Sequence, residues 1–138
     1  MTHSIDQIRS GALMGATRIK LQEELTTFPK DIFNLSDSLE ILDLSDNSLS
    51  SLPDDFGKLE KLKILFLSNN AFREVPKVLR SCPKLEMIAF KSNQISTFPE
   101  NALPLSTKWL MLTDNQIEHL PHSFGELTFL RKLALAGN

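Results

Sequence analysis

The sequence predicts an α/β-type solenoid, in which short repeats coil upon one another and their strands form one parallel sheet. Asparagine recurs at spacings of 23, 23, 22 and 23 residues, at Asn47, Asn70, Asn93, Asn115 and Asn138. Each asparagine ends a nine-residue segment with apolar residues at its fourth and sixth places, as in LEILDLSDN. An apolar-x-x-apolar-Pro step follows the first four of them. A fixed period of this length is typical of stacked structural repeats.

The first segment, residues 1–15, has the features of a short helix. Ser4 stands three residues before Gln7, which is a capping-box pattern, and Gly11 is a plausible stop signal. We therefore expect a helix over residues 4–10 that covers the N-terminal edge of the sheet. A disordered leader is the alternative.

Residues 16–38 resemble a degenerate first turn of the solenoid. Ile19 and Leu21 alternate as in a strand, and Phe28 with Pro29 matches the later Pro steps. The asparagine is missing and the spacing slips by one residue on either side. Such irregularity is expected at the end of a stack, where a repeat meets solvent or a cap.

The regular repeats occupy residues 39–138. They are 39–61, 62–84, 85–106, 107–129 and a partial repeat, 130–138. Side chains at the fourth and sixth places alternate along a short strand and are expected to point inward. The asparagine amides can satisfy backbone groups of neighbouring turns inside an apolar interior, so we interpret all five as a structural asparagine ladder.

The return segment of each repeat should close an outer wall. Proline fixes φ and stops helical continuation, which favours an extended or single-turn conformation there. The predicted wall residues are Phe56, Leu59, Leu79, Cys82, Leu105, Phe124 and Leu127. Cys82 is expected to be a small buried hydrophobic residue, and the Leu120 side chain to point into the core.

The repeat pattern resembles the leucine-rich repeat, LxxLxLxxNxLxxLPxxFxxLxx, from at least Leu39 to Asn138. The resemblance implies a right-handed superhelix of about six turns, with the sheet on the concave face and extended or 3-10 segments on the convex side. Repeat length and the LPxxF step look like the short intracellular class found in signalling scaffolds. LPLSTKWLMLTDNQIEHLP, SCPKLEMIAFKSNQI and IRSGALMGATRIKLQEELTTFP are similar to N-terminal arrays of bacterial proteins that continue into a protein-kinase-like domain.

The candidate binding residues are the outward-pointing ones at the third, fifth and seventh places. They are Ile41, Asp43, Ile64, Phe66, Met87, Lys91, Trp109, Met111 and Lys132. Most of this set is apolar, and charges of alternating sign occupy the neighbouring second places. An apolar centre with a charged margin is typical of a protein-binding surface. The alternative is that these side chains pack on one another or contact another part of the full-length chain.

Other classes of function find little support. The net charge of -2 offers no basic field for nucleic acid, and no apolar stretch is long enough to span a membrane. His119 and His122 flank Pro121 and lack helical metal-ligand spacing, so we expect no metal. No phosphate-binding loop or catalytic constellation is present, and we expect no cofactor. We therefore predict a cytoplasmic, non-enzymatic interaction module.

The parent protein is a separate question. The chain ends at Asn138, nine residues into a repeat, so we expect a longer protein whose next segment lies beyond this end. The partner could be that downstream domain, and any kinase motifs would lie there. A recognition part of a larger enzyme, a kinase or a secreted ligase, is the competing hypothesis. We expect a monomer, or a weak dimer through the open C-terminal sheet edge.

Overall fold

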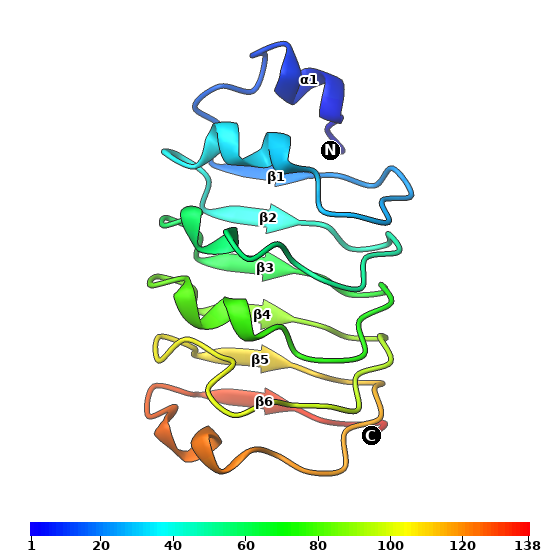
Figure 1. The fold of residues 1–138 in the computed structure, drawn as a ribbon, viewed down its shortest axis with the longest axis vertical. Coiled ribbons are helices and arrows are strands. Elements are labelled where there is room, and N and C mark those ends of the chain that lie inside the picture. The colour runs from blue at the N-terminus through cyan, green and yellow to red at the C-terminus, as the bar shows by residue number, and fades with distance from the viewer.

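The computed structural model describes residues 1–138 and shows a single column of stacked turns (Figure 1). Each strand pairs in parallel with the next one along the chain, so the sheet order follows the sequence order. The strands are β1 (Arg18–Lys20), β2 (Ile41–Asp43), β3 (Ile64–Phe66), β4 (Met87–Ala89), β5 (Trp109–Met111) and β6 (Lys132–Ala134). The predicted solenoid fold is confirmed.

The N-terminal helix α1 (Ile5–Arg9) lies beyond β1 at the end of the column (Figure 1). Ser4 Oγ accepts a hydrogen bond from the Gln7 N–H, and Gln7 Oε1 accepts one from the Ser4 N–H, which completes the capping box. Gly11 follows with a left-handed φ of +84°. Ile8 is buried against the first turn, so the predicted helix is confirmed and the disordered leader is wrong.

The convex side carries short 3-10 helices. They are η1 (Lys30–Leu35), η2 (Phe56–Lys58), η3 (Lys77–Ser81) and η4 (His122–Glu126). A proline in extended conformation directly precedes three of them, at Pro29, Pro76 and Pro121. The proline fixes φ and ends the extended return segment, and the short helix then leads back toward the next strand.

The repeat 85–106 departs from this pattern and corrects one prediction. Its outer segment has no 3-10 helix, and the predicted wall residue Leu105 is 47% exposed. Ala102 and Leu103 are buried in its place. This repeat is one residue shorter, and a tight turn in which Thr107 donates to the Pro104 carbonyl brings the chain back early. The turn moves Leu105 out of the wall.

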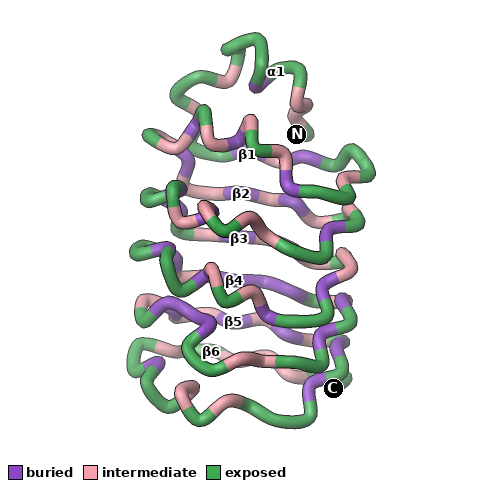
Figure 2. The backbone as a smooth tube through the Cα atoms, viewed as in Figure 1, coloured by how far each residue is buried: buried purple, intermediate pink, exposed green.

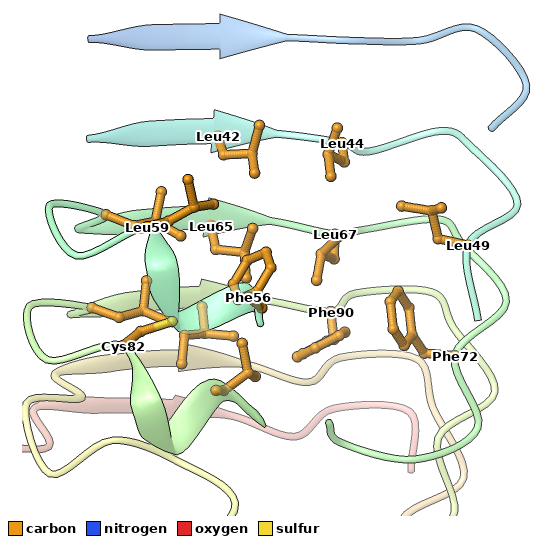
Figure 3. Packing of buried hydrophobic residues seen from close by; sticks show 14 of the residues in the cluster. Leu42, Leu44, Leu49, Phe56, Leu59, Leu65, Leu67, Phe72, Cys82 and Phe90 are labelled. Carbon is orange, nitrogen blue, oxygen red and sulfur yellow. The ribbon is translucent and has the colours of Figure 1, made fainter. Parts of the chain in front are cut away.

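The core is one continuous cluster of 29 buried residues that runs through the column (Figure 2). Leu42 and Leu65 on their strands and Phe56 on the outer wall belong to this cluster (Figure 3). Phe72 and Phe90 pack edge to face, with ring centroids 5.3 Å apart. Inward-pointing strand residues and the return segments thus meet in a single apolar layer, which fixes the direction of the outward-pointing side chains.

The asparagine amides connect successive turns by hydrogen bonds. Asn93 Oδ1 accepts from the Phe72 N–H at 3.0 Å, while Nδ2 donates to the carbonyls of Leu67 and Phe90. Equivalent Oδ1 and Nδ2 bonds are made by Asn47, Asn70, Asn115 and Asn138. Each amide therefore satisfies backbone groups in its own turn and in the preceding one.

One backbone requirement is not evident in the repeat pattern. The residue before each ladder asparagine has a left-handed φ between 54° and 77°, at Asp46, Asn69, Ser92, Asp114 and Gly137. Asn, Asp and Gly are the residues that adopt this conformation most readily. Asp46, Asn69, Asp114 and Gly137 therefore suit the turn that follows each strand.

Candidate functional site

The outward-pointing strand residues form two rows that run across the sheet, because the strands pair in register. The first row is Arg18, Ile41, Ile64, Met87, Trp109 and Lys132, and the second is Lys20, Asp43, Phe66, Ala89, Met111 and Ala134. Lys91 lies two residues beyond Ala89, on the same side of the chain. We call these two rows together with Lys91 the strand face. The strand face contains all nine candidate binding residues.

The apolar side chains of the strand face are half-buried, and not fully exposed as an open patch would be. Ile64 and Phe66 are intermediate in exposure, as are Trp109 and Met111, and Ala89 is buried. Neighbouring strands in a sheet lie about 4.8 Å apart, so side chains in one row cover part of each other. Both the binding hypothesis and the mutual-packing alternative are compatible with this partial exposure.

Two ion pairs flank the strand face at the second places of the repeats. Lys63 Nζ lies 3.7 Å from Glu40 Oε1, and Lys108 Nζ lies 2.8 Å from Glu86 Oε2. Lys108 Nζ also lies 6.0 Å from the centroid of the Trp109 ring. The alternating charges therefore pair across neighbouring turns, and the second pair restrains the side chain next to the single tryptophan.

The charged residues of the face itself are less engaged. Asp43 Oδ1 accepts a hydrogen bond from the Ser45 N–H at 3.0 Å, which turns this carboxylate toward its own backbone. Lys91 and Lys132 are exposed, and neither makes an ion pair. The two lysines are free to contact an external group.

The surface hollows lie away from the strand face. One is on the convex side between Arg80 and Phe124, two are beside the return segments around Ser50 and Glu74, and one is near Leu120 and Asn138. None is lined by a residue of the strand face. The face therefore offers a broad surface, and not a cavity of the kind that encloses a small molecule.

The last hollow brings a second correction. Leu120, predicted to point into the core, is 39% exposed, whereas its counterparts Leu52 and Phe98 are half-buried and Val75 is fully buried. The turn after Val75 covers that residue, but residues 130–138 leave Leu120 uncovered. His119 and His122 are both exposed, and no three metal-binding side chains cluster anywhere in residues 1–138.

Two titratable groups have shifted pKa values. Burial raises the pKa of the Cys82 thiol to about 12, because the thiolate would be desolvated in the outer wall. The Ser123 backbone N–H, and also that of His122, donates to the Glu100 carboxylate and lowers its pKa. Cys82 serves packing and Glu100 caps the start of η4, and neither lies on the strand face.

Known proteins share this sequence pattern and architecture. The family described as leucine rich repeat matches residues 22–72. The structure of a leucine-rich repeat protein from Leptospira interrogans superposes on 99% of the chain, with a TM-score of 0.82 and 27% identity. The chain has the leucine-rich repeat fold. No curated protein sequence matches it.

The chain is also similar to parts of two solved protein complexes. The plant peptide hormone receptor RGFR1, solved in complex with RGF2, matches 86% of the chain at 31% identity and a TM-score of 0.70. A chain from an octameric complex of Latrophilin 3, Unc5D and the leucine-rich repeats of FLRT2 matches 83% at 24% identity and a TM-score of 0.70, which shows the fold alone.

The match covers only part of each solved relative. The chain spans 34% of the Leptospira protein, 19% of the plant receptor and 37% of the third chain. No helix in the structure has the length and apolar character needed to cross a membrane.

Proposed function

We propose that this leucine-rich repeat protein is an interaction module that binds a protein partner on its strand face. The observation that carries the proposal is the in-register row of Ile41, Ile64, Met87 and Trp109 beside Phe66 and Met111. A folded protein rarely places this many large apolar side chains together on one side of a sheet unless something covers them. Trp, Phe and Met are also enriched in protein interfaces.

A similar solved structure supports a protein partner. The plant peptide hormone receptor RGFR1, at 31% identity, was solved in complex with RGF2. The lack of a hollow on the strand face favours a broad ligand, because a small molecule is usually enclosed. We extend the proposal to a cytoplasmic signalling role, as expected from the sequence, in which the partner could also be another domain of the same protein.

Substitution of Trp109 and Phe66 by alanine tests the proposal. The wild-type chain would first capture partners from a lysate of the source cell. The affinity of each captured partner would then be measured for the wild type and for the purified W109A/F66A variant. We expect binding to weaken at least about thirtyfold, because buried aromatic residues dominate interface energies. Circular dichroism would establish that the variant remains folded.

Phe129→Ala is the matched control. Phe129 is 61% exposed and lies outside the strand face, so its removal deletes an exposed aromatic ring of the same kind. Binding should be unchanged in this variant. If W109A/F66A binds like the wild type while folded, the strand face is not the interface, and mutual packing explains its apolar residues.

A further inference from the structure

The strand face differs in charge from the rest of the protein. The whole chain has a net charge of -2. The strand face has four basic side chains and one acidic one, namely Arg18, Lys20, Lys91 and Lys132 against Asp43. The apolar surface proposed to bind a partner therefore lies in a locally positive part of an acidic protein.

The free positive charge is concentrated beside the largest apolar side chains. Lys132 on β6 is the in-register neighbour of Trp109. Ala89, at the end of β4, is the in-register neighbour of Met111, and Lys91 lies two residues after Ala89. Arg131, next to Lys132, is also exposed and makes no ion pair. Trp109 and Met111 thus have uncompensated cations on either side.

The acidic groups in this part of the molecule are already engaged. Glu86 pairs with Lys108 at 2.8 Å, and Asp114 Oδ2 accepts a hydrogen bond from Ser92 Oγ at 2.8 Å. Neither carboxylate forms an ion pair with Lys91 or Lys132. Lys91 and Lys132 therefore have no ion-pair partner within the chain and can pair with carboxylates of a partner.

We propose that the β4–β6 part of the strand face recognises an acidic protein segment with an apolar side chain that packs on Trp109 and Met111. The proposal rests on the proposed function and names the chemistry of the partner. Carboxylates on either side of the apolar anchor would face Lys91 and Lys132. Charge complementarity of this kind raises association rates and selects among partners with similar apolar groups.

An acidic protein segment fits this surface better than a nucleic acid does. The apolar centre includes Met87 and Met111, which offer no planar surface for base stacking, and Trp109 is the only tryptophan. A peptide can have carboxylates only at the positions that face the free lysines, whereas a nucleic acid has a charged phosphate at every nucleotide.

Selection from a displayed random peptide library tests the charge preference. The wild-type chain is the bait, and the W109A/F66A variant removes peptides that bind elsewhere. We expect the enriched peptides to have net negative charge and at least one large apolar residue. Synthesised peptides from the selection should change the fluorescence of Trp109 on binding, because this residue is the only tryptophan.

Charge-reversal variants then test the two lysines. K91E/K132E should weaken binding of the acidic peptides at least about tenfold, and high salt should weaken wild-type binding in the same direction. The control K77E/K84E makes the same change in net charge at exposed lysines outside the strand face. It should leave the affinity within about twofold of the wild type.

The outcomes separate this inference from the proposed function. Enrichment of neutral or basic peptides that still need Trp109 would overturn the acidic preference while supporting strand-face binding. Equal loss of binding in K77E/K84E would also overturn it, as would displacement of the peptide by single-stranded RNA of equal charge. If the wild type enriches no peptide over W109A/F66A, the inference fails and the proposed function loses its support.

Discussion

The middle of the stack and its last turn contain the same repeat in different surroundings. Asn93 in the middle is 9% exposed, whereas Asn138 in the last turn is exposed although it makes the same kinds of hydrogen bond. Leu65 is fully buried, but Leu133, at the same place on β6, is only half-buried. The burial of a repeat residue thus depends on the neighbouring turns as much as on its own turn.

The N-terminal edge shows how a neighbour changes the environment of a terminal strand. The His3 N–H donates to the Lys20 carbonyl at 2.7 Å, and the Lys20 N–H donates to His3 Nδ1. Ile8 of α1 adds apolar cover. Ile19 in β1 and Leu21 directly after it are therefore fully buried, even though β1 pairs with only one other strand. Strands at sheet edges commonly need such cover.

The largest expected difference between middle and end comes from the asparagines. Asn93→Ala should lower the free energy of unfolding by about 3 kcal/mol, because it leaves the Phe72 N–H without a partner in the interior. It also removes one of the two asparagine hydrogen bonds to each of the Leu67 and Phe90 carbonyls. Asn138→Ala should cost about 1 kcal/mol, since water can reach the groups that it releases. Urea unfolding followed by circular dichroism measures both.

Asn138→Ala serves as the matched control for Asn93→Ala. Both substitutions delete the same amide at the same place of the repeat. Equal losses of stability would show that hydrogen bonds within the turn dominate, and that burial by neighbouring turns adds little. In a stack stabilised by nearest-neighbour contacts, the middle substitution should also broaden the transition, because it can uncouple the two halves.

Much of this architecture was accessible from the sequence because the repeat is periodic. Strand residues, the inward positions and the strand-face rows follow from spacing alone, and the Ser4–Gln7 pattern predicted α1. Failures occurred where the period breaks or the stack ends. The short repeat 85–106 moves Leu105 outward, and Leu120 has no later turn in residues 1–138 to cover it.

The candidate site was only partly predictable for a different reason. Spacing places Trp109 and Met111 on one side of the sheet, but exposure depends on how far neighbouring side chains cover them. The Lys108–Glu86 pair and the engagement of Asp43 with its own backbone are set by rotamers, which a repeat pattern does not specify. Which lysines remain without an ion-pair partner depends on the same rotamers.

A smaller difference is expected at the glycines after the outer-wall phenylalanines. A Cβ on Gly57 would collide with Ser81 of the next turn, whose Oγ donates to the Val78 carbonyl. No atom lies within 4 Å of the corresponding point on Gly125. We expect Gly57→Ala to cost about 2 kcal/mol by overpacking and Gly125→Ala to change stability by less than about 1 kcal/mol, as measured by urea unfolding.

A double variant identifies the contact responsible. Ser81→Gly removes the Cβ and Oγ that the new methyl group would meet, so Gly57→Ala combined with Ser81→Gly should recover most of the loss. Without such recovery, the cost of Gly57→Ala would arise from backbone conformation and not from close contact between turns.

The smallest effect concerns pH and the middle of the outer wall, where Cys82 replaces the leucine of other repeats. Burial raises the pKa of its thiol from 9.0 to about 12, so the folded state holds the proton that the unfolded state releases. This stabilisation is complete below pH 9 and declines as the pH rises toward 12.

Between about pH 8 and about pH 10, the wild type should lose about 1 kcal/mol more of its free energy of unfolding than Cys82→Ala, which lacks the thiol. Urea unfolding of both proteins at the two pH values gives this difference. The titration of lysines is common to both proteins and cancels in the comparison. If the wild type and Cys82→Ala lose the same free energy of unfolding, the thiol titrates in the folded state as it does in the unfolded chain. The wall around Cys82 would then be as accessible to solvent as the last turn.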